Sequence, residues 1–131
     1  MLLVKTKLGL SNINGIGLYA NEFIPKGTLV WRFEEKLDLK LCEPAYQALK
    51  KQYDFETLDK YIYKSRVSGC FILCTDDARF INHSNKPNTL DTQEGDEGVT
   101  IAVRDIRPGE EITSNYESFD ADFDTYGDSL L

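Results

Sequence analysis

Short apolar segments separated by turns rich in proline and glycine constrain the fold of this chain more than any other feature. Apolar and polar residues alternate over residues 2–8, and the alternation resumes at 16–20 after a loop rich in Ser, Asn and Gly. Leu, Trp and Phe then occupy every second position of 29–33, directly after a Pro-Lys-Gly turn at 25–27. Successive side chains of a strand point to opposite faces, so each segment predicts a short β-strand. We therefore expect strands to dominate the first third of the chain.

The middle of the chain changes character before extended segments return. Leu41, Ala45 and Leu49 fall at helical spacing. Pro44 suits a first helical turn, where a missing N–H costs nothing, so a helix is predicted over 44–53. The segment 106–109 echoes 24–27, and shared turn chemistry explains this better than an internal repeat. The remaining expected elements are extended chain at 61–74, a helical turn at 76–81, a loop at 85–88, and strands at 100–103 and 111–113 joined across the turn at 107–109.

Length and composition favour one domain. The 131 residues are 41% hydrophobic, which is enough for a single core. No segment approaches the ~18 consecutive apolar residues of a membrane span, and the first residues are too short an apolar run for a signal peptide, so we expect an intracellular protein without a membrane partner. A net charge of −7 disfavours nucleic acid as a partner. The same charge suits a basic partner or serves solubility alone, and composition does not decide between them.

The three cysteines, Cys42, Cys70 and Cys74, argue against a disulfide framework because their number is odd. Cys70 and Cys74 share one extended segment, which places them about 13 Å apart, too far for a disulfide between them. The same separation weakens a zinc site built from the three cysteines and His83, since the ligands of one ion must converge. Buried apolar thiols are the favoured interpretation, and no metal is expected.

Three other segments have polar or backbone groups that can meet a ligand. Gly15-Ile16-Gly17 lets the backbone approach a ligand closely, but it lacks the third glycine and the following helix of a dinucleotide-binding motif. Asn82-His83 lies among side chains that can hydrogen-bond their own backbone, and a lone histidine is more often structural than catalytic. Tyr116 ends a strand where an acidic tail begins, and taken alone it is an interface aromatic.

Together and in this order, the three segments resemble the SET domain family of protein lysine methyltransferases. The matching residues are Gly15-x-Gly17 followed by Leu18-Tyr19-Ala20, then Asn82-His83-Ser84-x-x-Pro87-Asn88, then Gly109-Glu110-Glu111-x-x-x-x-Tyr116. The resemblance implies a mostly β fold with short helices, a SET-domain-like β-clip of several small sheets, with pseudoknot-like threading of the C-terminal segment. It divides the chain into a core at 1–116 and an acidic flank at 117–131. Because the first motif begins by residue 15, we expect a minimal, single-domain form, with a homodimer as one way to complete it.

The resemblance also implies an activity, which is transfer of a methyl group from S-adenosylmethionine to a lysine of a basic protein or peptide such as a histone tail. The family's closing tyrosine lies beside the transferred methyl group, so Tyr116 is implied to be catalytic. The residues implied to bind the cofactor are Gly15, Ile16, Gly17, Asn82, His83 and Tyr116.

A second aromatic residue is expected to line the channel for the substrate lysine, with Tyr61 and Tyr63 as equal candidates. Aromatic residues after the tyrosine cap the channel in the family, which makes Phe119, Phe123 or Tyr126 a candidate lid over it. The alternative is a non-catalytic binding module on the same β scaffold, because a fold does not guarantee its usual chemistry.

Overall fold

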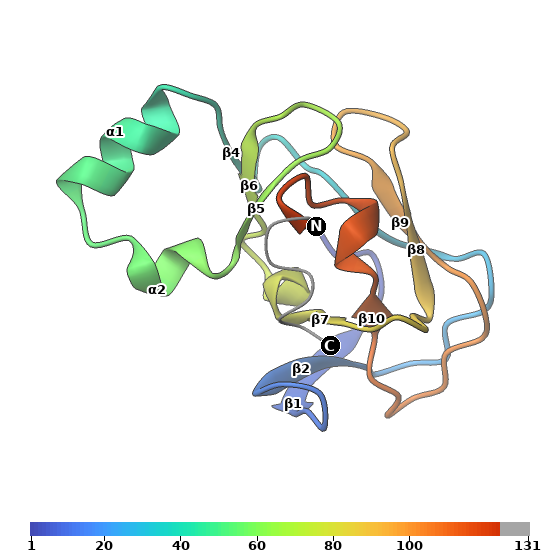
Figure 1. Cartoon of the computed structure of the whole chain (residues 1–131). Coiled ribbons are helices and arrows are strands. Elements are labelled where there is room, and N and C mark those ends of the chain that lie inside the picture. Colours follow the sequence, from blue (N-terminus) through green and yellow to red (C-terminus); the bar gives the residue numbers. More distant parts are fainter. Residues whose placement is uncertain (124–131) are drawn as a thin grey trace.

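The computed structural model describes residues 1–123, which form short strands with a few helical turns (Figure 1). The elements in chain order are β1 (Thr6–Leu10), β2 (Ile16–Ala20), β3 (Leu29–Arg32), β4 (Leu39–Leu41), α1 (Ala45–Gln52), α2 (Glu56–Asp59), β5 (Ile62–Lys64), β6 (Phe71–Leu73), the 3-10 turn η1 (Asp77–Phe80), β7 (Asn82–His83), β8 (Thr89–Thr92), β9 (Val99–Ala102), β10 (Thr113–Ser114) and the 3-10 turn η2 (Tyr116–Ser118).

The strands are distributed over four small sheets, which confirms the mostly β class. Their strand orders are β1-β2, β3-β9-β8, β4-β6-β5 and β10-β7. All neighbours are antiparallel except β7 and β10, which pair in parallel. This pairing brings the Asn82-His83 segment beside the strand that leads into Tyr116, as the expected threading of the C-terminal segment requires. The predicted helix and the predicted helical turn at 76–81 correspond to α1 and η1.

The main hydrophobic core joins the two echoed turns. Ile24 and Ile106, each at most 1% exposed, exchange both backbone hydrogen bonds at 2.8 Å. The two turn glycines are also related, because the N–H of Gly27 donates to Ala102 and the N–H of Gly109 donates to Ala20. The echo in the sequence therefore corresponds to two turns that pair with each other across the core. The buried members of this core are Leu18, Ala20, Ile24, Val30, Ala102, Ile106 and Ile112.

The expectation that Leu29, Trp31 and Phe33 share one face of a regular strand is wrong. The pairing of β3 with β9 shifts register between Leu29 and Trp31, so a β-bulge interrupts the alternation. Val30 and Trp31 are consequently both buried, at 0% and 6% exposure, and they belong to two different core clusters. A strand buried on both sides no longer follows a period of two.

The strands expected at 100–103 and 111–113, joined across the turn at 107–109, do not pair with each other. Strand β9 pairs with β3 and β8, whereas β10 pairs with β7, and Glu111 forms an isolated bridge with Tyr19. The turn at 107–109 therefore connects segments that belong to different sheets. Strand β8 and helix α2 were not expected from the sequence. Strand β8 begins directly after Pro87-Asn88, and α2 begins two residues after Asp54, and residues of these types favour loops.

The interpretation of all three cysteines as free thiols is wrong. Cys42 and Cys70 form a disulfide, and only Cys74 is a free buried thiol in the described chain. The two partners are brought together because β4 and β6 pair, with Leu41 opposite Phe71. The disulfide occupies two of the four ligands considered for zinc, so that alternative fails. Within residues 1–123, no helix has both the length and the apolar composition needed to cross a bilayer.

Candidate active site

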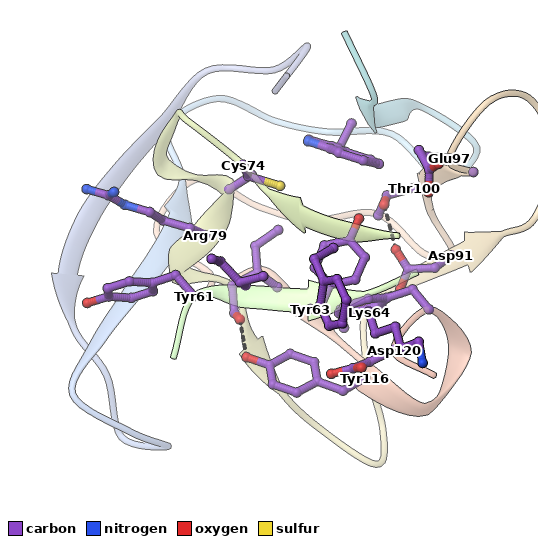
Figure 2. Close-up of a pocket in the computed structure, with 18 of the residues that line it drawn as sticks. Tyr61, Tyr63, Lys64, Cys74, Arg79, Asp91, Glu97, Thr100, Tyr116 and Asp120 are labelled. Carbon is purple, nitrogen blue, oxygen red and sulfur yellow. Dashed lines mark hydrogen bonds between the residues drawn. The ribbon is translucent and has the colours of Figure 1, made fainter. Parts of the chain in front are cut away.

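Two adjoining cavities, of about 550 and 420 Å³, lie beside Tyr116. The smaller one is bounded by the glycine turn and Asn82, and the larger one by the strand β5, Tyr63 and Phe119. Figure 2 shows Tyr63 near the centre of the residues that line the larger cavity, with Tyr116 below it. The two cavities share six lining residues, which are Asn14, Lys60, Tyr61, Arg79, Ile81 and Tyr116.

The glycine turn and Asn82 are held together by one side-chain amide. The Nδ2 group of Asn82 donates to the carbonyls of Asn14 at 3.1 Å and Ile16 at 3.4 Å. Gly15 has φ +50 and no atom within 4 Å of where a Cβ would be, so its open side faces available space. Asn82 therefore positions the turn that the sequence pointed to, and Gly15, Ile16 and Asn82 together line the smaller cavity.

Glu111, for which the sequence indicated no role, holds Asn82 and the loop before the glycine turn in place. Its carboxylate accepts hydrogen bonds from Asn82 Nδ2 at 2.9 Å and from Ser11 Oγ at 2.8 Å. A Cβ on Gly17 would lie 2.5 Å from Glu111 Oε2, so only glycine leaves room for the carboxylate. Gly17 thus serves the packing of the turn and does not line either cavity, whereas Gly15 does.

Tyr116 follows β10 and begins η2, and two hydrogen bonds define its orientation. Its hydroxyl donates to the carbonyl of Ile81 at 2.5 Å, and its backbone N–H donates to Nδ1 of His83 at 3.1 Å. Burial, with smaller contributions from Asp120 and Glu111, raises the pKa of Tyr116 to about 12. The phenol is therefore protonated at neutral pH, and the lone pairs on its oxygen remain available at the junction of the cavities.

His83 lies behind Tyr116 and lines neither cavity. Because Nδ1 accepts from Tyr116, the other ring nitrogen carries the proton and donates to Asn85 Oδ1 at 3.1 Å. The imidazole is 7% exposed, and its centroid is 5.2 Å from that of the Tyr116 ring. These contacts make His83 a support for Tyr116, and its predicted contact with a cofactor stays a prediction.

Both candidate channel tyrosines line the larger cavity, and Tyr61 also lines the smaller one. Phe119 packs edge-on against Tyr63 at 4.8 Å and against Tyr116 at 5.4 Å between centroids. Burial, followed by the charges of nearby acidic groups, holds the pKa of Tyr63 well above its usual value. Phe123 contacts His83 at 5.6 Å, and Tyr126 lies outside the described residues.

Residues 119–121 of the acidic flank cover the edge of the β4-β6-β5 sheet. The N–H of Arg66 donates to Phe119 at 3.1 Å, and the N–H of Ala121 donates to Lys64 at 2.7 Å. Asp120 forms an isolated antiparallel bridge with Ser65 between these two bonds. Residues 119–121 thus pair with residues 64–66, at the end of β5, and Phe119 lines the larger cavity.

Comparison with known proteins identifies this arrangement. The SET domain family matches residues 15–117, a span that contains the glycine turn, the Asn82-His83 segment and Tyr116. The chain belongs to the SET domain family.

Relatives of this SET domain are much longer proteins. A histone-lysine N-methyltransferase of Schizosaccharomyces pombe, specific for lysine 36 of histone H3, is 30% identical over 130 residues, which cover 94% of this chain and 15% of that protein. Human histone-lysine N-methyltransferase 2D is 30% identical over 129 residues, which cover 91% of this chain and 2% of that protein. The chain therefore spans only a small part of these methyltransferases.

Solved structures agree with the fold of the SET domain. A Plasmodium falciparum protein provisionally assigned as a histone methyltransferase superposes with a TM-score of 0.59 at 19% identity, covering 88% of this chain and 95% of that one. The ctPRC2 complex, in an autoinhibited conformation bound to S-adenosylmethionine, gives a TM-score of 0.65 at 22% identity over 96% of this chain and 17% of that one. These matches confirm the expected fold class.

Proposed function

We propose that this SET domain transfers a methyl group from S-adenosylmethionine to a lysine side chain of a basic protein. The observation that carries the proposal is the position of Tyr116, which lines both cavities at their junction. A methyl donor in one cavity and an amine in the other can meet at this junction, beside the hydroxyl group of Tyr116. The sequence relatives, which are histone-lysine methyltransferases, support the same reaction.

The smaller cavity fits the proposed methyl donor. The open side of Gly15 and the backbone of Ile16 provide a cradle without side-chain obstruction, and Lys60 and Arg79 place positive charge where a carboxylate can be bound. When bound, S-adenosylmethionine supplies an electrophilic methyl group on a positively charged sulfur. The residues assigned to hold it are Gly15, Ile16, Asn82, Lys60 and Arg79, with Gly17 and His83 acting through the turn and through Tyr116.

The larger cavity suits the alkyl chain and amine of lysine. Tyr63 and Phe119 provide an aromatic wall, and Tyr61 sits at the junction between the side chains of Lys60 and Arg79, whose charged ends are 5.0 and 5.3 Å from its ring centroid. A lysine has a pKa of about 10.4 in water and attacks only when neutral. Burial and the two nearby cations lower the pKa of an amine at the junction and so favour the neutral nucleophile.

Tyr116 orients the amine and requires no change of its own protonation. Its hydroxyl hydrogen is engaged by Ile81, so its oxygen faces the junction as an acceptor. It can accept a hydrogen bond from the amine and direct the nitrogen lone pair toward the methyl carbon, roughly 3–3.5 Å away in a reactive geometry. Positioning of this kind needs no metal ion.

The proposed substrate is a basic protein, and a histone is the first candidate because of the chain's net charge of −7 and its relatives. Because these relatives act on histones, we also place the protein inside the cell, in the cytoplasm or the nucleus. A homodimer stays a prediction.

Incubation with radiolabelled S-adenosylmethionine and a panel of histones and basic peptides tests the proposal. We expect labelled lysine with the wild type and a fall in kcat of about 100-fold or more for Tyr116→Phe, while calorimetry shows unchanged affinity for S-adenosylmethionine. Tyr53→Phe is the matched control, since Tyr53 is 58% exposed and outside both cavities. Equal labelling by Tyr116→Phe and Tyr53→Phe would remove the catalytic role of Tyr116, and binding without labelling of any substrate would favour a binding module.

A further inference from the structure

Strand β8 directs an apolar side chain toward solvent and a charged side chain toward the interior. Leu90 is 48% exposed, whereas the next residue, Asp91, turns inward and lines the larger cavity. Asp91 stands opposite Thr100 in the β8-β9 pairing, and Thr100 is only 5% exposed. A strand that directs a leucine to water and a carboxylate inward gives up hydrophobic burial and desolvates a charge. Such a choice points to a use for the carboxylate inside the cavity.

The Asp91 carboxylate is held in place by hydroxyl groups from three elements. Thr100 Oγ1 of β9 donates to Oδ1 at 2.6 Å, and Ser118 Oγ of η2 is 3.0 Å from Oδ2. Ser114 Oγ of β10 also donates to Oδ2. Hydroxyl donors favour the charged form of the carboxylate without neutralising it. The Asp91 carboxylate is therefore fixed in one position on the wall of the larger cavity.

Asp91 has no cationic partner in the described chain. Its carboxylate takes part in none of the ion pairs within residues 1–123, although Lys64 lines the same cavity. The neighbouring acid Glu97 differs, because Lys40 Nζ lies 2.6 Å from its carboxylate. The charge of Asp91 is thus left for a group that enters the cavity from outside.

The charges of the cavity differ between its two ends. Figure 2 shows Arg79 and Tyr61 on one side and Asp91 with Thr100 on the other. Lys60 and Arg79 line both cavities, whereas Asp91 lines only the larger cavity and not the smaller one. A cation that enters the larger cavity is therefore attracted toward Asp91 and its acidic neighbours and is repelled by the junction. The acidic neighbours that line the same cavity are Asp59, Glu97, Asp120 and Asp122.

We infer that Asp91 is the specificity residue that recognises the ammonium group of the substrate side chain. The inference rests on the proposed function, because it assigns the larger cavity to the substrate lysine. The ammonium group binds to Asp91 in its protonated form through N–H···O hydrogen bonds. No proton is transferred and no covalent bond changes in this step. As the amine moves to the cationic junction beside Tyr116, it gives this proton to solvent water and becomes neutral. An uncharged side chain of the same length gains nothing from Asp91, so recognition selects lysine.

The test uses n-butylammonium, which is the lysine side chain without its backbone, and n-butanol as its uncharged counterpart. Each is titrated into isotopically labelled protein while the amide NMR signals of Thr100 and Ser114 are followed. We expect n-butylammonium to bind the wild type, and Asp91→Asn to weaken this binding at least about tenfold, the usual effect of losing a hydrogen bond to a charged group. Binding of n-butanol should be the same in both proteins.

Asp96→Asn is the matched control. Asp96 is exposed, lies in the turn between β8 and β9 outside both cavities, and loses the same charge in the same substitution. The control should bind n-butylammonium as the wild type does. If Asp91→Asn does not fold, as judged by circular dichroism, Asp91→Ser replaces it, since serine keeps a hydroxyl for the surrounding donors.

Equal n-butylammonium affinity in the wild type and the Asp91 variant would overturn the inference. A wild type that does not bind n-butylammonium at all would overturn it as well. Calorimetry with S-adenosylmethionine and methylation of basic peptides are run on the same proteins. Unchanged cofactor affinity with a KM for peptide raised about tenfold in Asp91→Asn supports recognition by Asp91. Ammonium binding that depends on Asp91, without any methyl transfer, would refute the proposed function and leave Asp91 as a residue that binds an ammonium group but no substrate lysine.

Discussion

Gly17 has no room for a side chain, because the carboxylate of Glu111 lies where a Cβ would be. The carboxylate is in turn bound by Ser11, 100 residues away in sequence, and by Asn82. A residue that looks like a flexible turn glycine in the sequence is therefore fixed by packing. Gly15 differs, because its side faces open space and its positive φ is the constraint.

Gly17→Ala should displace the Glu111 carboxylate and break its bonds to Ser11 and Asn82. We expect a loss of about 1–3 kcal/mol in the free energy of unfolding in urea, and at least tenfold weaker binding of S-adenosylmethionine by calorimetry, about 1.4 kcal/mol. Gly27→Ala serves as the control, since Gly27 has φ +88, open space around it and no place in either cavity. The control should lose stability through backbone strain and keep its cofactor affinity, and equal affinity in the two variants would contradict the role of the turn.

Asp91 should make folding stability depend on pH in an unusual direction. Burial raises the pKa of Asp91, against the hydrogen bonds from Ser114, Thr100 and Ser118, which lower it. The folded state therefore holds the proton more tightly than the unfolded state, and the contribution of Asp91 to stability falls as pH rises from its unfolded to its folded pKa.

The expected outcome is that Asp91→Asn unfolds at a higher temperature than the wild type at pH 7. The difference should shrink as the pH is lowered toward the unfolded pKa of about 3.9. Thermal unfolding from pH 4 to pH 8 measures it, with Asp96→Asn as the reference for a simple change of surface charge. If the unfolding temperatures of Asp91→Asn and the wild type differ by the same amount from pH 4 to pH 8, ionisation of Asp91 does not destabilise the folded state.

At the scale of elements, the parallel pair β7 and β10 assembles the site with only two residues in each strand. Asn88 extends this short ladder, because its Oδ1 accepts the N–H of Thr113 at 2.9 Å and its Nδ2 donates to the carbonyl of Glu111 at 2.8 Å. Its side chain is 2% exposed, so these bonds are protected from water. The asparagine of the Pro87-Asn88 motif therefore acts as part of the sheet.

The helical segment between β4 and β6 is closed at its base by the Cys42–Cys70 disulfide. This segment contains α1, α2 and β5, and it provides Tyr61 and Tyr63 to the wall of the larger cavity. Closing a loop with a sequence separation of 28 lowers the entropy of the unfolded chain by an amount worth about 3.5 kcal/mol.

Reduction of the disulfide should consequently lower the free energy of unfolding by roughly 2–4 kcal/mol. Urea unfolding with and without a reductant measures the effect. The double variant Cys42→Ser with Cys70→Ser should be as unstable as the reduced protein and insensitive to reductant. The third thiol gives a further control: burial raises the pKa of Cys74 to about 12, so iodoacetamide at neutral pH should label it only after unfolding. Three rapidly labelled thiols in the untreated native protein would contradict the pairing.

At the scale of the whole molecule, the net charge of −7 should favour association with basic substrates. Salt screens such attraction, with a Debye length of about 10 Å at 0.1 M. Raising NaCl from 50 to 500 mM should therefore increase KM for a peptide with several flanking Lys or Arg residues by several-fold and leave kcat nearly unchanged. A peptide with the same target lysine and neutral flanks should respond far less. An equal response would mean that salt acts on the SET domain itself and not on its attraction to the peptide.

The sequence by itself determined those features that depend on neighbouring residues. The strand at Ile16–Ala20, the helix that follows Pro44 and the turn that becomes η1 were all predicted, because spacing and turn chemistry act over a few residues. The ordered motifs around Gly15, Asn82 and Tyr116 also sufficed to indicate the family, since each is a short string of adjacent residues.

Tertiary structure alone decided which distant segments meet. The pairing of Cys42 with Cys70, the parallel contact of β7 with β10 and the bond from Asn82 to Asn14, 68 residues apart, depend on the path of the whole chain. The bulge in β3 and the inward turn of Asp91 likewise follow from strand pairing that no local period encodes. Hydrogen bonds and burial between remote segments are satisfied only after the sheets assemble, and this is why the site's charges became visible only in the folded chain.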